Sequence, residues 1–160
     1  MEDIQLEDKD FHVWVLLDRT RRLINKLRRK ELKRYGISVP EAAVLFLIQA
    51  IAKHGSLVTP AELSRWMVRE PHSVSGILQR MVKKGFVIKR NSCLDRKNLV
   101  TVTLTEKGKS ALRGAVERKS IHEVMSSLSD GEREQLMSLL DKLRGKTYNR
   151  LDIETKPPFP

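Results

Sequence analysis

The residues from Pro71 to Lys84 carry many side chains that can form hydrogen bonds with a polar partner. In PHSVSGILQRMVKK, the apolar residues Val74, Ile77, Leu78 and Met81 recur at the spacing of one buried helix face. The unburied positions are His72, Ser73, Ser75, Gly76, Gln79, Arg80 and Lys83. Hydroxyls, an amide and a guanidinium on a helix can contact base edges in the major groove of DNA, although a solvated helix face can have the same composition.

A second group of charged residues lies in NSCLDRKNLVTVTLT, from Asn91 to Thr105. The strict alternation from Leu99 to Thr105 is typical of a strand with one buried face, and the run from Phe86 to Arg90 predicts a partner strand. The two strands would flank a hairpin tip that carries Asp95, Arg96 and Lys97. Cations at such a tip can contact a phosphate backbone or enter a minor groove. Asp95 either starts the turn or orients the guanidinium of Arg96, and both roles are compatible.

The charge of the chain favours a polyanionic partner. The 160 residues include 31 Lys and Arg against 20 Asp and Glu, which gives a net charge of +11 and a pI near 10.0. Nucleic acid and an anionic membrane are both compatible with this excess, as is a merely soluble basic protein. Nine cations and three anions fall between Pro60 and Val100, so more than half of the net charge lies around the two groups described above.

The elements that must position these groups are mostly helices. Periodicity and helix-start residues predict helices from about Asp10 to Tyr35, Ser38 to Gly55, Ala61 to Met67, Pro71 to Lys84, Thr105 to Leu128, and from Ser129 onward. A short helix, a tight turn, a second helix and a hairpin together form a winged helix-turn-helix. The predicted fold class is therefore mainly α with a small β-hairpin.

The first and last helices carry apolar residues that a lone winged helix has little reason to expose. Trp14 and Leu17 lie at helical spacing on the first helix, and the last helix carries a stripe of Leu136, Leu139, Leu140 and Leu143. We therefore expect these helices to form a homodimer. The expected organisation is an N-terminal dimerisation helix over 1–36, a DNA-binding unit over 37–108, and C-terminal dimerisation helices with a tail over 109–160, all in one compact domain.

The sequence resembles the multiple antibiotic resistance regulators, the MarR-type winged helix-turn-helix transcription factors, over about Phe11 to Leu143. The resemblance rests on TPAELSRWM, EPHSVSGILQRMVKKGFVIKR and DRKNLVTVTLTEKG, which occur in the family's order and spacing. It implies a homodimer that binds a pseudo-palindromic operator, usually as a repressor relieved by a ligand. It also implies that the Pro71 helix enters the major groove and wing Arg96 the minor groove. Two positions depart from the family: Lys97 stands where a second arginine is frequent, and Gly76 where a longer polar side chain is frequent.

Other functions leave weaker signals. No nucleophile motif or phosphate-binding glycine loop is present, so we expect neither an enzyme nor a bound cofactor. A metal-sensing variant would require His12 and His122 to meet, and no metal site is predicted. A redox-sensing variant would use Cys93, whose thiol pKa Arg90 and Arg96 could lower.

Trp14 and Trp66 either line an effector cleft or, as we favour, pack in the core. A winged helix used only as a protein-interaction scaffold is a further alternative, against which the concentrated positive charge argues.

The remaining features favour a cytoplasmic protein without membrane contact. The longest apolar run, 42–52, is too short to span a bilayer. The acidic start MEDIQLEDKD is unlike a secretory signal, and a single cysteine suits a reducing compartment. The expected partners are therefore double-stranded DNA, a second copy of the chain and a small-molecule effector.

Overall fold

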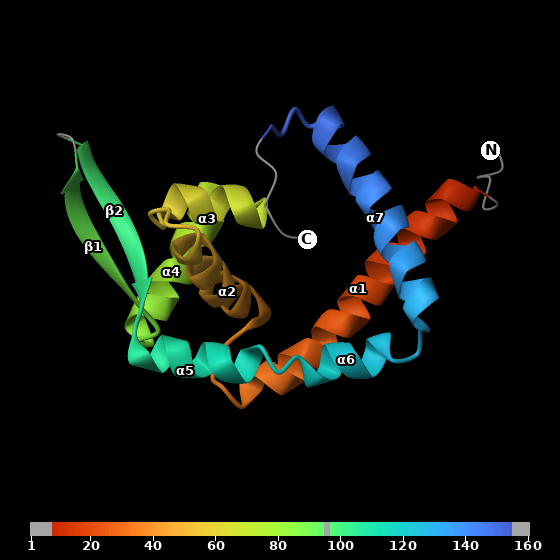
Figure 1. Cartoon of the computed structure of the whole chain (residues 1–160), viewed down its shortest axis with the longest axis horizontal. Helices are drawn as coiled ribbons and strands as arrows, with labels where there is room; N and C mark the ends of the chain where they lie inside the picture. The colour runs from red at the N-terminus through yellow and green to blue at the C-terminus, as the bar shows by residue number, and fades with distance from the viewer. Residues whose placement is uncertain (1–7, 95–96, 155–160) are drawn as a thin grey trace, which may run out of the picture.

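A computed structural model gives the fold of the protein; it describes residues 8–94 and 97–154, and the side chains of these residues except those of 92–98. The predicted order of helices and strands is confirmed, with one extra helix (Figure 1). The elements are α1 Lys9–Lys33, α2 Val39–Lys53, α3 Pro60–Met67, α4 Pro71–Lys83, β1 Val87–Leu94, β2 Lys97–Leu104, α5 Glu106–Ala115, α6 Lys119–Met125 and α7 Asp130–Arg150.

The predicted helix starts are set by local capping chemistry. Ser38 and Glu41 form a reciprocal capping box at α2, and Ser129 and Glu132 form another at α7. The hydroxyl of Thr59 accepts a hydrogen bond from the backbone N–H of Glu62 and caps α3. These bonds satisfy helix-end N–H groups that would otherwise lack partners, so the starts could be recognised without knowledge of the fold.

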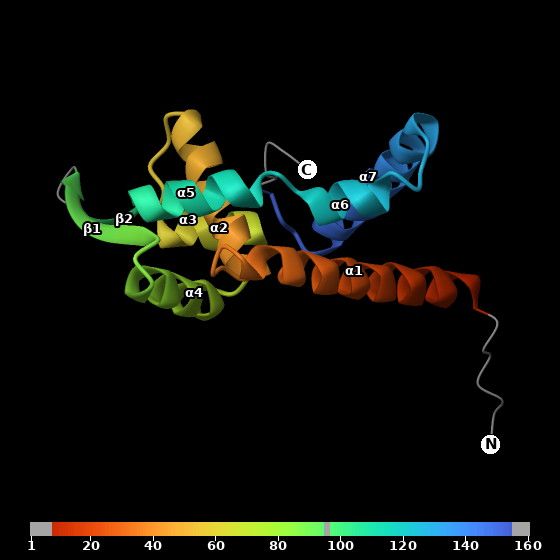
Figure 2. The ribbon, with the colours of Figure 1, turned by 90° about the horizontal axis from the view of Figure 1, so that it is seen from below.

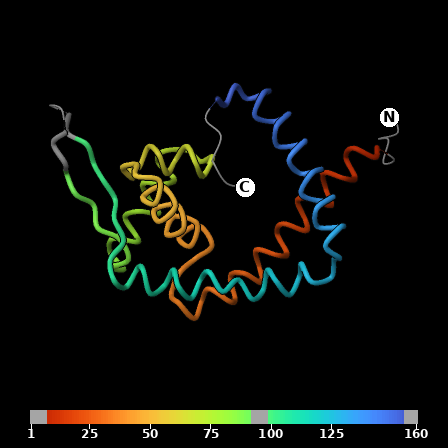
Figure 3. The backbone as a smooth tube through the Cα atoms, viewed as in Figure 1, coloured from red at the N-terminus to blue at the C-terminus, as the bar shows by residue number. Residues whose placement is uncertain are grey.

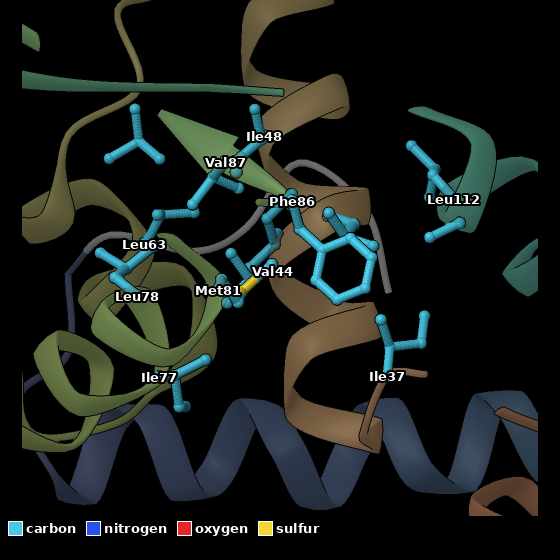
Figure 4. Close-up of a cluster of buried hydrophobic side chains, with 14 of the residues drawn as sticks. Ile37, Val44, Ile48, Leu63, Ile77, Leu78, Met81, Phe86, Val87 and Leu112 are labelled. Atoms are coloured by element: carbon cyan, nitrogen blue, oxygen red, sulfur yellow. The ribbon is translucent and has the colours of Figure 1, made fainter. Parts of the chain in front are cut away.

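The core lies where α2, α3, α4, α5 and the base of the hairpin meet (Figure 4). The four apolar residues predicted for the buried face of α4 are all buried there. They belong to one buried cluster with apolar side chains from the other elements, among them Val44, Leu63, Phe86 and Leu112. This packing places the opposite face of α4 outward, where Figure 2 shows the helix projecting on the side of the molecule away from α5.

The hairpin is antiparallel and longer than predicted. Its register runs from Val87 opposite Leu104 to Leu94 opposite Lys97, so Asn91 to Leu94 belong to β1 and not to the tip. Val102 is 1% exposed and its N–H donates to the carbonyl oxygen of Val58 at 2.8 Å, whereas Val100 is 37% exposed. The expected buried face therefore exists only at the base, because the outer half of the hairpin extends beyond the core.

The prediction of one continuous helix from Thr105 to Leu128 is wrong, because the chain breaks between α5 and α6. Arg118 has a left-handed backbone, with φ of 51°. The break is held by a buried ion pair from α1, in which Arg28 donates to Glu31 at 2.7 Å. Arg28 also donates to the carbonyl oxygen of Ala115 at the end of α5, and Glu31 accepts from the N–H of Lys119 at 2.9 Å at the start of α6.

The charges at this break match the helix dipoles. A cation lies at the C-terminus of α5 and an anion at the N-terminus of α6, where each is favourable. Burial alone raises the pKa of Glu31, but hydrogen bonds from Ser120 and Arg28 outweigh it and lower the pKa to about 2. Two charged residues of α1 thus replace the hydrogen bonds that a continuous helix would have formed.

The molecule is elongated, and its two ends differ in packing (Figures 1 and 3). The hairpin forms one end, and the N-terminal half of α1 with α6 and α7 forms the other. Although α7 crosses α1 in Figure 1, Figure 2 shows the two helices apart, and no residue of α7 is buried. No single helix in residues 8–94 and 97–154 is long and apolar enough to cross a bilayer.

Candidate nucleic-acid interface

The outward face of α4 carries the residues predicted to contact DNA. His72, Gln79, Arg80 and Lys83 are exposed, while Ser73, Ser75 and Gly76 are partly exposed. At 100° per residue, His72, Gly76, Gln79 and Lys83 fall within one narrow stripe, and Arg80 lies beside it. Within the described part of the chain, the side chains on this face form no hydrogen bond or ion pair, so they are available to a partner.

The N-terminus of α4 is also available. No side chain caps it: Glu70 is the N-cap residue, and its carboxylate accepts no hydrogen bond from the backbone N–H groups of the first turn. Such a helix end presents backbone N–H groups with a partial positive charge, which suit a phosphate oxygen. The turn before it is fixed by Ser64, whose hydroxyl donates to the carbonyl oxygen of Arg69 at 2.6 Å.

Gly76 lies at the centre of the outward stripe. A Cβ atom built at Gly76 would lie 3.7 Å from Nη1 of Arg80, which is an ordinary van der Waals distance. Nothing inside the protein therefore requires a glycine in this helix, where it costs about 0.5–1 kcal/mol relative to alanine. The missing side chain instead lets another surface approach the helix backbone.

The cations around α4 have two different roles. Lys84 is bonded within the protein, although its side chain is 42% exposed: its ammonium group donates to both carboxylate oxygens of Glu41 at 2.9 and 3.0 Å and to the carbonyl oxygen of Gly36 at 3.3 Å. Arg65 pairs with Glu62. In the described residues of this region, the cations without an ion pair are Arg69, Arg80, Lys83, Lys89 and Arg90.

Sequence reasoning did not include Arg69, Lys89 or Arg90 among the site residues. Arg69 belongs to the turn before α4, and Lys89 and Arg90 belong to the inner half of β1. Arg69 and Arg90 are exposed and Lys89 is partly exposed, on elements adjoining α4. The local excess of positive charge in the sequence includes these three residues, but the predicted site included only some of the cations that make up this excess.

The C-terminal end of α4 is held by several hydrogen bonds at the base of the hairpin. Lys107 donates to the carbonyl oxygen of Lys84 at 2.7 Å, and its ammonium group lies 4.9 Å from the centre of the Phe86 ring. Thr105 donates to the carbonyl oxygen of Gly85 at 2.6 Å. A Cβ atom at Gly108 would overlap the carbonyl oxygen of Phe86, so only glycine permits this contact. These contacts fix the hairpin relative to α4.

Burial and hydrogen bonding oppose each other at Glu41. Burial raises the pKa of this carboxyl, but hydrogen bonds from Lys84 and from the backbone N–H of Ser38 more than offset it, so the pKa lies below its usual value. Glu41 therefore remains ionised and joins the start of α2 to the end of α4.

Several predicted residues lie at the hairpin tip. Asp95 and Arg96 lie outside the described residues, and Lys97 is placed only by its backbone, opposite Leu94. Cys93 lies in β1 opposite Asn98, and its side chain is outside the described part. The roles of these residues therefore stay predictions.

The two tryptophans lie in different surroundings. Trp66 packs against the core and donates from Nε1 to Glu62 at 3.0 Å, which confirms core packing for this residue. Trp14 is 60% exposed and stacks on Phe11, so the expectation of core packing is wrong for Trp14 within a single chain. The physical reason is that this half of α1 extends beyond the core.

Neither histidine proposed for a metal-sensing variant belongs to a metal-binding cluster. His12 and His122 are exposed on α1 and α6. Among the described residues, no group of three or more His, Cys, Asp or Glu side chains is placed to hold a metal ion.

The helix-turn-helix of α3 and α4, followed by a hairpin, defines a winged helix-turn-helix protein. A sequence profile of the MarR family matches residues 35–98. The chain is also 32% identical over 127 residues to the transcriptional repressor MprA of Escherichia coli strain K12, covering 78% of this chain and 68% of that protein. The chain belongs to the MarR family.

Solved structures agree with this assignment. The organohalide-sensing regulator RdhR-CbdbA1625, in a form bound to 2,4-dichlorophenol, superposes with a TM-score of 0.85 at 30% identity, over 100% of this chain and 95% of that one. A MarR variant from E. coli, complexed with operator DNA, superposes with a TM-score of 0.76 at 23% identity. The superposition covers 86% of the present chain and 97% of the MarR chain. The latter similarity shows the fold alone.

Proposed function

We propose that the protein is a homodimeric transcriptional regulator that binds double-stranded DNA through α4 and the hairpin. The observation that carries the proposal is the outward face of α4, whose cations and polar groups have no partner among the described residues although they lie on a rigidly packed helix. A helix with one face packed in the core presents the other to the major groove in a fixed orientation. The exposed Arg69 and the inner cations of β1 would then contact phosphates on either side.

The predicted contact set extends this proposal. His72, Ser73, Ser75, Gln79 and Arg80 would face base edges, with Gly76 allowing close approach and Lys83 contacting phosphate. At the hairpin tip, Arg96 would enter the minor groove, held by Asp95, while Lys97 would contact the backbone.

The homodimer is supported by the surface of the single chain. Its accessible surface is 12321 Å², whereas a compact folded protein of this mass exposes about 8,200 Å². The excess of about 4,000 Å² per chain is more than the roughly 1,000–2,500 Å² that each subunit buries in an obligate homodimer interface, so the chain has ample surface for a partner. Exposed apolar residues cluster on α1 and α7, including Trp14, Leu17, Leu136, Leu139, Leu140 and Leu143.

We further propose that the protein is a repressor that responds to a small molecule. The support comes from relatives: MprA is a transcriptional repressor, and RdhR-CbdbA1625 has been solved with 2,4-dichlorophenol. A cleft lined by both Trp14 and Trp66 stays a proposal that would require the partner subunit.

The test of DNA binding is a titration of duplex DNA at two salt concentrations. An operator is first selected from random duplexes, and its affinity is compared with that of a scrambled duplex by fluorescence anisotropy. We expect tighter operator binding and a logarithmic salt slope of about −0.9 for each phosphate contact. A scaffold that binds only proteins would select no sequence and show no steep salt slope.

A further inference from the structure

The outward side of α1 carries a continuous row of cations. At 100° per residue, one sector of about 100° around the helix axis holds only lysine and arginine between positions 19 and 33. All of these side chains are exposed, and we call them the cationic stripe: Arg19, Arg22, Lys26, Arg29, Lys30 and Lys33. The opposite sector of α1 packs in the fold through Arg28, Glu31 and Leu32, which are buried.

The cationic stripe is not neutralised within the protein. Arg22 pairs with Asp18 at 2.7 Å, but the other five cations form no ion pair among the described residues. Like charges three or four residues apart on a helix repel one another. From Arg19 to Lys33 the stripe extends about 21 Å along the helix axis. A straight row of unpaired cations of this length is complementary to a rod-like polyanion.

The packing of α1 favours a nucleic acid over a membrane surface as the partner of the stripe. An amphipathic helix binds a membrane by burying its apolar face among the lipids, opposite its charged face. In the C-terminal half of α1, the side opposite the stripe already packs against α2 and α6. That side is therefore not free to enter a bilayer.

The cationic stripe and the outward face of α4 lie on the same side of the molecule. Figure 2 shows α5 and α6 on one side, and α1 with α4 on the other. Arg28 and Glu31 of α1 point toward the break between α5 and α6, to which they are hydrogen-bonded. The stripe, on the opposite sector of the helix, therefore faces the side on which α4 presents its unpaired cations.

The proposed homodimer would place the stripe between the two α4 helices. In Figure 1 the hairpin forms one end of the chain, and α1 extends from the winged helix toward the other end, where dimerisation is proposed. Dimeric helix-turn-helix proteins bind half-sites about one helical turn of DNA apart, roughly 34 Å. Because the major groove faces the protein at each half-site, the minor groove and the phosphates beside it face the protein midway between them.

We propose that the cationic stripe of α1 binds the phosphates of the DNA segment between the two half-sites. Phosphate contacts carry no base information, so the stripe adds affinity and fixes the orientation of the dimer on the duplex. The inference rests on the proposed function, since it requires DNA binding by a dimer through α4. It adds a contact surface outside the winged helix, on the helix assigned to dimerisation.

The test replaces selected phosphates of the operator with neutral linkages. Methylphosphonate linkages remove the phosphate charge and keep the bases. They are placed either between the two half-sites of the selected operator or in the flanks outside both half-sites, and fluorescence anisotropy measures the affinity of the full chain for each duplex. Neutral linkages between the half-sites should weaken wild-type binding at least about tenfold, because several charge contacts are lost together.

A triple variant and a charge-matched control assign this loss to the stripe. The triple variant combines Lys26→Gln, Lys30→Gln and Lys33→Gln. The control combines Lys53→Gln, Lys109→Gln and Arg113→Gln, which remove three exposed cations of α2 and α5 outside the stripe and outside the proposed contacts of α4 and the hairpin. Circular dichroism and sedimentation compare the fold and assembly of each variant with the wild type.

The two variants should respond differently to the position of the neutral linkages. Between the half-sites, these linkages should weaken binding of the triple variant less than about twofold, whereas the control should lose as much affinity as the wild type. In the flanks, where the hairpin is proposed to bind, the loss should be the same for all three proteins. The salt slope of operator binding should fall by about 1 for each stripe cation removed and stay unchanged in the control.

The wild-type measurement decides the proposal even without the variants. Wild-type binding that is indifferent to neutral linkages between the half-sites would overturn it, as would an equal loss for the triple variant and the wild type. In both cases the proposed function would stand, because the wild type would still select an operator; failure to select one would contradict the proposed function itself. Retention on vesicles of anionic phospholipid by the wild type but not the triple variant, with no effect of the neutral linkages, would assign the stripe to a membrane surface and overturn the proposal.

Discussion

The glycine at position 76 is unfavourable for the helix that contains it, and this cost points to contact with a partner. Its neighbours within the protein leave room for a methyl group, since the nearest atom, Nη1 of Arg80, would be 3.7 Å from it. The family resemblance also marks the position as unusual, because longer side chains are frequent there. The glycine would shorten the distance between the backbone of α4 and a groove floor.

Gly76→Ala should therefore separate stability from binding. The free energy of unfolding, measured by urea denaturation, should rise by about 0.5–1 kcal/mol, because alanine is the better helix former. Affinity for the selected operator, measured by anisotropy, should fall, because the methyl group would keep the helix backbone away from the bases. Unchanged operator affinity in a stabilised protein would contradict the close approach.

Two adjacent lysines at the end of α4 illustrate how neighbouring cations differ in role. Lys83 is exposed without a partner in the described residues, and Lys84 bonds to Glu41 and Gly36. Lys83→Gln should leave the free energy of unfolding within about 0.5 kcal/mol of wild type and reduce the salt slope of DNA binding by about 1.

Lys84→Gln should show the opposite pattern. It leaves the buried Glu41 carboxylate without its charged partner, so the free energy of unfolding should fall by about 1–3 kcal/mol while the salt slope stays the same. Equal effects of both substitutions on the salt slope would show that Lys84 also contacts DNA.

The junction between the hairpin and α5 depends on one close backbone contact. Thr105, Lys107 and Gly108 at the start of α5 meet the carbonyl groups that follow α4, and Gly108 lies against the Phe86 carbonyl. The wing is thus oriented by backbone contacts at its base.

Gly108→Ala should destabilise the protein by about 2 kcal/mol or more, because the new methyl group would displace backbone that cannot yield locally. Gly131→Ala is the matched control: its Cβ would meet nothing within 4 Å, so unfolding should change little. Urea denaturation measures both. A mild effect at position 108 would mean that β1 can shift without loss of packing.

The break between α5 and α6 predicts a specific dependence of stability on pH. The folded-state pKa of Glu31, about 2, lies below its ordinary value of 4.5. A carboxyl with a lowered folded-state pKa stabilises the protein above its unfolded-state pKa, and this contribution is lost as the pH falls toward the folded-state pKa. The relevant window therefore extends from about pH 4.5 down to about pH 2.

Glu31→Gln should lower the free energy of unfolding near neutral pH. The difference from wild type should shrink as the pH is lowered through this window, because protonation removes the advantage of the charged group. Urea denaturation at several pH values measures the difference directly, and other carboxyls cancel in the comparison. A difference that stays constant down to pH 2 would show that the carboxylate charge is not what stabilises the break.

At the scale of the whole molecule, the single chain leaves apolar surface uncovered on α1 and α7. The N-terminal half of α1 and all of α7 expose apolar residues that no other part of the described chain covers, and α7 has no buried residue. A second copy related by two-fold symmetry would cover both surfaces at once.

Leu139→Glu should weaken dimerisation by about 1,000-fold, because each dimer buries the position twice and each buried leucine contributes about 2 kcal/mol. Ser138→Glu adds the same side chain to the next exposed position of α7, on a different face, and should leave the dimer intact. Sedimentation equilibrium separates the two results. A dimeric Leu139→Glu protein would exclude the stripe from the interface. The monomeric variant should also lose cooperative binding to paired half-sites.

The sequence by itself determined the elements whose causes are local. Helix starts at Ser38, Thr59 and Ser129 follow from hydrogen bonds within four residues, and the buried face of α4 follows from the spacing of Val74, Ile77, Leu78 and Met81. The order of helices and strands, and with it the winged helix, was predictable for the same reason.

Only the tertiary structure decided features that depend on residues far apart in the chain. The break at Arg118 has no proline to mark it, because its cause is the Arg28–Glu31 pair about 90 residues earlier. The role of Lys84 depends on its hydrogen bonds with Glu41, which lies 43 residues earlier in the chain. Periodicity and capping depend on residues close together in the sequence. Whether a cation forms an ion pair within the protein depends on residues that the fold brings close in space.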